Sequence, residues 1–311
     1  MSGQDFGRLL TAMVTPFTPR LEVDYDRAGE LARKLVAEGN DGLVVCGTTG
    51  ESPTLGTDEK IRLFRAVRAA VGDEVPMLAG TGSNNTRASV ELSRAAAEAG
   101  ASGLLLVAPY YNKPSQEGLY QHFKTVAEST DLPVMLYNIP GRTGVEISPE
   151  TLARLAEIPQ IVAVKESLPS IDPVSDLLAR LRGAKVPAAT VGAEMPRQPM
   201  RVYSGDDSNT LPQLAVGGHG VVSVAGHLAA GEMREMILHY LAGRVKQAQE
   251  IHLRLFPLFR GLFITSNPVP VKAALRMVGF PVGSVRAPLV EATAAEEKQI
   301  EAMLKAVGLL K

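Results

Sequence analysis

The amino-acid sequence predicts an α/β protein, a (β/α)8 or TIM barrel with a C-terminal helical extension. The chain has 311 residues, and such a barrel typically needs about 250 residues. Eight short apolar runs alternate with longer helix-like segments, which is typical of parallel βαβ units. After about residue 230 the strand-like runs stop and only helix-like patterns follow.

The predicted strands are short and almost continuously apolar, as expected of parallel strands that are buried on both faces. In chain order they are Leu10–Val14, Gly42–Cys46, Pro76–Gly80, Gly103–Val107, Pro133–Tyr137, Ile161–Lys165, Arg201–Ser204 and Gly220–Val224.

Helix boundary residues mark several of the segments between these strands. Asp58 is a candidate N-cap for a helix to Val71, and Gly100 is a candidate end residue for a helix over Thr86–Ala99. Ser115 is the expected N-cap of a helix that runs to about Ser129. A further helix is expected over Ser148–Leu155 because Ser-Pro-Glu is a strong helix opening.

The C-terminal part reads as helical throughout. Its predicted helices are Glu232–Ala242, Val245–Phe263, Val269–Val278 and Ala294–Val307. We therefore expect two regions, a catalytic barrel over residues 1–230 and a helical domain over residues 231–311, with no long linker between them.

Composition excludes several classes of protein. Apolar residues make up 45% of the chain and charged residues 21%, so a large core can be buried. The formal net charge is −1 with no basic stripe, which argues against a nucleic-acid partner. The single cysteine, Cys46, permits no disulfide framework, and no run is apolar and long enough to span a membrane. We expect no signal peptide and a reducing cytoplasmic location.

Lys165 carries the main chemical signal. It ends the apolar run Ile161–Lys165, and the chemistry of a (β/α)8 barrel takes place at the carboxyl ends of its strands. A lysine buried there is desolvated, which favours the neutral amine, and a neutral amine can attack a ketone to form a Schiff base. The alternative is a structural lysine paired with Glu166 or placed at one end of the barrel.

Three other features fall at predicted strand ends on the same side. Tyr137 ends the neighbouring strand, and its phenol could move protons. The turn Gly47–Gly50 offers backbone N–H groups and two threonine hydroxyls to an anion. Arg142 lies in a Gly-Arg-Thr-Gly turn, where a guanidinium suits a carboxylate. Each feature alone is weak evidence for a site, because such residues are common in protein cores and on protein surfaces. Together they predict Schiff-base chemistry on a small 2-oxo acid with a second, carboxylate-bearing substrate.

The same segments resemble the dihydrodipicolinate synthase / N-acetylneuraminate lyase family. The resemblance rests on residues 47–52, 110–118, 137–144, 164–166, 204–207 and 217–223, and it covers about residues 8–230 in the family's order. It implies a lyase that uses pyruvate, with no metal or organic cofactor. Arg142 favours the branch that condenses pyruvate with L-aspartate 4-semialdehyde to 4-hydroxy-tetrahydrodipicolinate, on the path to diaminopimelate and lysine.

The resemblance also implies roles for individual residues. Lys165 would form the enamine with pyruvate, and Tyr137, Thr49 and Tyr111 would form a proton relay, with Tyr111 supplied across a dimer interface. Thr48 and Thr49 would hold the pyruvate carboxylate. Gly205 and the backbone carbonyl of Val222 would line the pocket, and Arg142 would bind the second substrate. The family is typically a homotetramer, a dimer of dimers.

Two departures and two alternatives stay open. The stretch around Arg182–Met200 is longer than is usual in the family. We expect a surface insertion there, because lengthening a loop costs little free energy. The alternative is a changed tetramer contact or pocket rim. Lys60 and Ala88 replace the histidine and acidic residue of lysine-inhibited members, which predicts weak or absent feedback by lysine. The alternatives are an aldolase for a 2-keto-3-deoxy sugar acid and a non-catalytic paralogue that binds 2-oxo acids.

Overall fold

A computed structural model describes residues 6–183 and 199–311. Eight parallel strands close into a barrel in which each strand pairs with the next along the chain, and β8 pairs with β1. The strands are β1 (Leu9–Ala12), β2 (Gly42–Val45), β3 (Met77–Gly80), β4 (Gly103–Val107), β5 (Val134–Asn138), β6 (Ile161–Glu166), β7 (Arg201–Ser204) and β8 (Gly220–Ser223). The predicted fold class is confirmed, and every strand lies within two residues of its predicted bounds.

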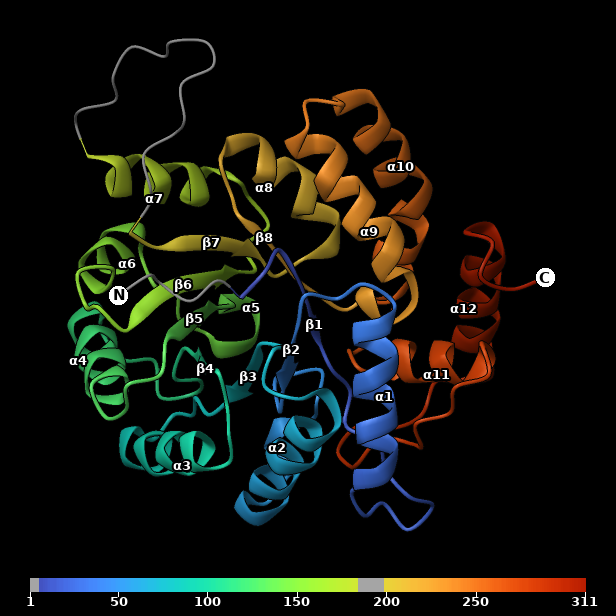
Figure 1. The fold of residues 1–311 in the computed structure, drawn as a ribbon, viewed down its shortest axis with the longest axis horizontal. Helices are drawn as coiled ribbons and strands as arrows, with labels where there is room; N and C mark the ends of the chain where they lie inside the picture. Colours follow the sequence, from blue (N-terminus) through green and yellow to red (C-terminus); the bar gives the residue numbers. More distant parts are fainter. Residues whose placement is uncertain (1–5, 184–198) are drawn as a thin grey trace.

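Helices cover the outside of the barrel (Figure 1). Those up to β8 are α1 (Tyr25–Ala37), α2 (Thr57–Val71), α3 (Thr86–Glu98), α4 (Gln116–Ala127), α5 (Pro140–Thr143), α6 (Pro149–Leu155), α7 (Asp172–Arg182) and α8 (Thr210–Val216). After β8 follow α9 (Gly226–Leu241), α10 (Val245–Gly261), α11 (Val269–Met277) and α12 (Ala294–Ala306). Single 3₁₀ turns, η1 (Ser52–Thr54) and η2 (Asp207–Asn209), follow β2 and β7.

Most helix starts follow the predicted capping residues. The Ser115 and Ser148 side chains accept hydrogen bonds from the backbone N–H groups of Gly118 and Thr151. The prediction for Asp58 is wrong, because α2 begins one residue earlier. Its N-cap is Gly56, whose N–H donates to the Glu59 carboxylate at 2.9 Å. Asp58 instead lies in the first turn, where an acidic side chain complements the helix dipole.

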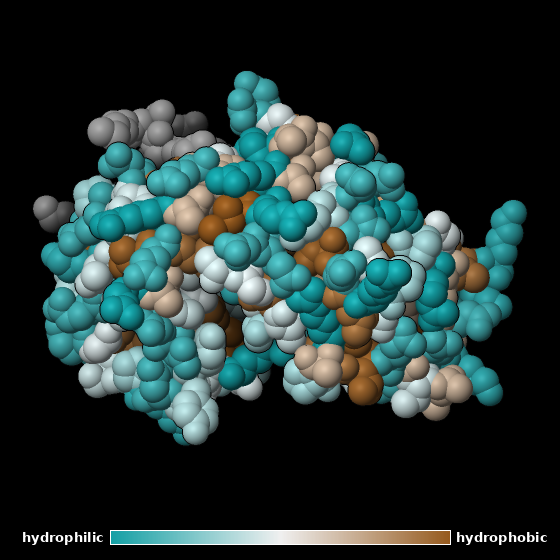
Figure 2. All heavy atoms as spheres, turned by 90° about the horizontal axis from the view of Figure 1, so that it is seen from below, coloured by the Kyte–Doolittle hydropathy of each residue, from teal (hydrophilic) through white to brown (hydrophobic). Residues whose placement is uncertain are grey.

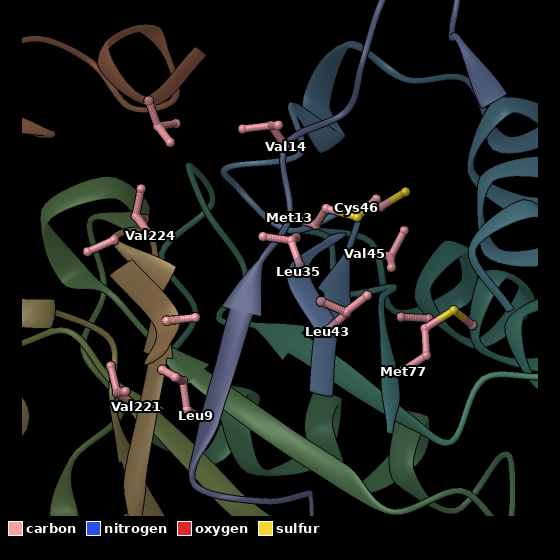
Figure 3. Close-up of a cluster of buried hydrophobic side chains, with 14 of the residues drawn as sticks. Leu9, Met13, Val14, Leu35, Leu43, Val45, Cys46, Met77, Val221 and Val224 are labelled. Atoms are coloured by element: carbon pink, nitrogen blue, oxygen red, sulfur yellow. The ribbon is translucent and has the colours of Figure 1, made fainter. Parts of the chain in front are cut away.

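The core has two layers, which follow from the alternation of side chains along each strand. Outward-facing residues pack under the helices, and Figure 3 shows part of this layer, with Leu9 of β1 beside Val221 of β8. Inward-facing residues fill the barrel and include Leu10, Ala163 and Val222. The interior is therefore a packed core, and a substrate has access only at its ends.

The helical region after β8 packs directly on the barrel. α9 contacts both β1 and α10, and the predicted boundary near residue 230 falls inside this helix. The division into two domains stays a prediction. The predicted insertion around 182–200 falls, from 184 to 198, outside the described residues.

Hydrophilic side chains dominate the face seen in Figure 2, and hydrophobic residues gather there only in small areas. Among the described residues, no helix is both long enough and apolar enough to cross a membrane.

Candidate active site

Lys165 lies at the carboxyl end of β6 with its side chain turned into the mouth of the barrel. Ala163, two residues earlier, belongs to the packed barrel interior, so the strand alternation directs Lys165 to the same side. The residue is only 5% exposed. Register places it directly opposite Tyr137 of β5, and its Nζ lies 4.2 Å from the centroid of the Tyr137 ring. A buried amine beside a phenol is the arrangement that the sequence predicted.

Gly205 leaves the space that the lysine occupies. A Cβ atom at this position would lie 2.9 Å from Lys165 Cε and 1.9 Å from Ser167 Oγ. The Gly205 N–H donates to the Glu166 carbonyl at 2.7 Å, which holds the end of β7 against β6. Any side chain here would displace the lysine or Ser167, so the site requires glycine at this position.

A cavity of about 470 Å³ opens around the lysine. Six of the eight predicted site residues line it, namely Thr48, Thr49, Tyr137, Arg142, Lys165 and Gly205. A volume of this size accommodates small-molecule substrates.

The Thr48–Thr49 turn is held in place by its own backbone and by the segment that follows β1. The Gly50 N–H donates to the Gly47 carbonyl at 3.1 Å, and the Thr15 hydroxyl donates to the Gly50 carbonyl at 2.6 Å. Thr49 is buried, and its Oγ1 accepts a hydrogen bond from Asn267 Nδ2 at 2.9 Å. A fixed turn that presents hydroxyls to a cavity can bind a carboxylate without further reorganisation.

A buried ion pair fastens this turn to the C-terminal helices. Glu51 forms an ion pair with Lys272 of α11 at 2.6 Å, with side chains only 1% and 3% exposed, and it accepts the backbone N–H of Arg286 at 2.9 Å. Burial lowers the pKa of Lys272 to about 8, although the Glu51 carboxylate acts in the opposite direction. The Lys272 ammonium also donates to the Ser284 carbonyl at 2.7 Å.

The Arg142 loop is anchored at both ends. Asn138 exchanges two hydrogen bonds with the backbone of Ile147, at 3.1 and 3.0 Å, and donates a third to Glu166 at 3.0 Å. Burial raises the pKa of the Glu166 carboxyl to about 8, against the opposing effect of the Asn138 hydrogen bond. The Arg142 side chain itself is exposed and lines the cavity, and no carboxylate of the described residues lies within salt-bridge distance of it. Its guanidinium is therefore available to an anionic ligand.

Two predicted site residues lie elsewhere. Tyr111 is 89% exposed and does not line the cavity within this chain. Val222 pairs with Leu10 and faces the barrel interior, whereas Val224, two residues further on, lines the cavity.

The structure also brings residues to the cavity that the sequence reasoning missed. They are Ile139, Gly141, Ser167, Asp206, Val224, Phe263, Ser266 and Asn267. Asp206 belongs to a segment that carried the family resemblance, which could have flagged it. Nothing in the local sequence pattern around Phe263, Ser266 and Asn267 points to the barrel mouth. Among the described residues, no group of three or more His, Cys, Asp or Glu side chains could hold a metal ion.

Taken together, the fold and the cavity define a (β/α)8-barrel lyase with a buried lysine at the carboxyl end of its strands. The chain belongs to the dihydrodipicolinate synthetase family, whose model matches residues 5–307.

The relatives are similar to this chain over nearly its full length. It is 57% identical to the 4-hydroxy-tetrahydrodipicolinate synthase of Heliobacterium modesticaldum, over 98% of this chain and 97% of the relative. Among solved structures, dihydrodipicolinate synthase DapA-2 of Bacillus anthracis matches with a TM-score of 0.90 and 47% identity, over 97% and 98% of the two chains. The chloride-inhibited Acinetobacter baumannii enzyme, solved in complex with pyruvate, matches with a TM-score of 0.91 and 36% identity, over 98% and 100%.

Proposed function

We propose that this chain condenses pyruvate with L-aspartate 4-semialdehyde to give 4-hydroxy-tetrahydrodipicolinate, with Lys165 as the covalent nucleophile. The family and the full-length relatives support the reaction, which belongs to the synthesis of diaminopimelate and lysine. One observation carries the role of the lysine: its amine is buried at the mouth of the barrel against Tyr137 and beside the Thr48–Thr49 turn.

The chemistry follows from that placement. The neutral amine adds to the ketone carbon of pyruvate, and water leaves to give an imine on Nζ. Loss of a proton from the pyruvate methyl group then gives an enamine, whose terminal carbon attacks the aldehyde of the second substrate. The protonated imine takes up the electron pair when the methyl proton leaves, and the aldehyde oxygen takes it up in the attack and is protonated to a hydroxyl. The amino group of the semialdehyde then adds to the imine carbon and displaces Lys165 Nζ, which closes the ring and frees the lysine, so no organic cofactor or metal is required.

The other residues bind the substrates and move protons. Thr48 and Thr49 hold the pyruvate carboxylate, and Gly205 together with the backbone of Val222 shapes the pocket. Arg142 binds the carboxylate of the semialdehyde, which its exposed and unpaired guanidinium supports. Tyr137 and Thr49 relay protons together with Tyr111.

Tyr111 acts from a second copy of the chain. Its 89% exposure is unusual for a tyrosine with a site role, and it supports a position in an interface between chains. The assembly is a homotetramer, a dimer of dimers, that works in the cytoplasm.

Replacing Arg142 with alanine separates the two substrates. The variant should use the semialdehyde poorly, with kcat/KM for that substrate lowered by roughly a hundredfold because a charged hydrogen-bonding partner is lost. The rate of imine formation with pyruvate should stay within about twofold of that of the unmodified chain. An equal loss in both measurements would refute the role of Arg142. Activity on 2-keto-3-deoxy sugar acids but not on the semialdehyde would refute the proposed reaction.

A further inference from the structure

We infer that Asn267 is a positioning residue for the reaction, which sets the direction in which the Thr49 hydroxyl donates its proton. The inference rests on the proposed function, because it gives the segment between α10 and α11 a part in proton transfer at the barrel mouth. Asn267 is 6% exposed, lines the same cavity as Thr49 and lies 2.9 Å from its hydroxyl oxygen.

The direction of this hydrogen bond matters. Asn267 Nδ2 can only donate, so the Thr49 oxygen must accept. The single hydroxyl hydrogen of Thr49 is then left for a different acceptor. Tyr137 lines the same cavity, and a relay between the two residues needs Thr49 to donate in a fixed direction. With no partner such as Asn267, the hydroxyl could rotate and donate elsewhere.

Asn267 is itself held in register with the turn that it contacts. Five residues further on, Lys272 forms its buried ion pair with Glu51, two residues after Thr49. The Val269 N–H donates to the Ser266 carbonyl at 2.9 Å, which tightens the chain around Asn267. Two contacts between the same pair of segments therefore fix the asparagine relative to the threonine.

The other end of the amide makes no hydrogen bond within the described part of the fold. Asn267 Oδ1 is buried and has no hydrogen-bond partner among the described residues. An unsatisfied buried carbonyl destabilises the folded state, and an apolar side chain of similar shape would avoid that cost. The residue is thus better explained by its action on Thr49 than by its contribution to folding.

The test combines variants at both positions. Asn267→Ala should lower kcat roughly five- to tenfold, the effect of one neutral hydrogen bond, with KM for both substrates within about twofold. In a Thr49→Val background, the same substitution should change kcat by less than about twofold, because its target is already gone. Equal losses in the two backgrounds would overturn the inference.

Asn267→Asp gives a second readout that packing alone would not produce. Its carboxylate can only accept, which reverses the hydrogen bond with Thr49, so kcat should fall below that of Asn267→Ala at high pH. It should recover as the pH falls and the protonated carboxyl regains a donor. A pH profile that matches that of Asn267→Ala would contradict the inference.

A measurement of stability distinguishes a positioning role of Asn267 from a structural one. Asn267→Leu should unfold at a urea concentration equal to or above that of the unmodified chain, yet lose activity as Asn267→Ala does. Thr293→Ala, which removes the N-cap of α12, is the control that loses stability and keeps kcat. A lower unfolding midpoint for Asn267→Leu would indicate a structural role and overturn the inference.

Trapping of the pyruvate imine on the unmodified chain by borohydride distinguishes failure of the proposed function from failure of the inference about Asn267. If no adduct forms, the proposed function fails and the inference with it, whereas an adduct with an inert Asn267 refutes only the inference.

Discussion

Replacing Lys272 with methionine should be one of the most destabilising single changes in the barrel mouth. Methionine keeps most of the side-chain volume but leaves the Glu51 carboxylate with the Arg286 backbone N–H and no counter-ion. The two side chains are 3% and 1% exposed, so water cannot replace the lost partner. Breaking a buried pair in this way typically costs about 3–5 kcal/mol.

The assay is urea-induced unfolding at pH 7 and at one fixed protein concentration, since association between chains would shift the midpoint. Arg276→Met is a matched control on the same helix. Its partner is Glu297, and the two side chains are 55% and 37% exposed, so this surface pair should be worth less than about 1 kcal/mol. The double variant Glu51→Gln with Lys272→Met should recover much of the loss, because the buried charge is gone. A cost below about 1 kcal/mol for Lys272→Met would refute the view that this pair fastens the Thr48–Thr49 turn.

Three further predictions follow from contacts and charges. Gly205→Ala should slow imine formation with pyruvate and lower the free energy of unfolding by about 1–3 kcal/mol, because its Cβ would meet Ser167 and Lys165. The control Gly141→Ala should change neither quantity, because nothing lies within 4 Å of its Cβ. Equal rates of imine formation in the two variants would contradict this. Burial lowers the pKa of His122 from 6.5 to about 4, so the unfolded chain binds more protons and stability is lost as the pH falls from about 6.5 towards 4. His122→Asn should reduce that loss by about 3 kcal/mol, measured as the unfolding free energy against pH. An unchanged profile would contradict this, because it would show that the pKa of His122 does not differ between the folded and unfolded states. Sub-millimolar lysine should leave the condensation rate unchanged, because Lys60 would repel the ligand's ammonium group, and measurable inhibition would refute this.

Much of the fold could be predicted because parallel strands buried on both faces appear as short apolar runs. Helix boundaries are harder to predict where a helix is buried on several sides. α9 packs against β1, β8 and α10, so it lacks a clear polar face, and its predicted start at Glu232 was six residues too late. The N-cap of α2 was misplaced because Gly56 has no side chain to signal it and relies on Glu59 instead.

The site residues that could be predicted from the residue pattern are those that lie at the ends of strands. Lys165 and Tyr137 follow from the rule that barrel chemistry lies at the carboxyl ends of strands, whereas Gly205 came from the family resemblance. Asn267 could not be found in this way, because only the packing of α11 against the mouth brings it to Thr49. Tyr111 does not line the cavity of its own chain, so its place in the site follows from the family resemblance alone. The strand register directs the Val222 side chain into the barrel and brings Val224 to the cavity, so the role of the Val222 backbone carbonyl stays a prediction.

Borohydride trapping with pyruvate, followed by peptide mass spectrometry, tests the central claim most directly. Among the described residues, two buried lysines lie near the mouth, and of these Lys165 lines the cavity whereas Lys272 does not, although the pKa of Lys272 is lowered to about 8. The account predicts a single reduced pyruvate adduct on the peptide that contains Lys165, and none in Lys165→Arg. An adduct on Lys272, or no adduct on the unmodified chain, would contradict it.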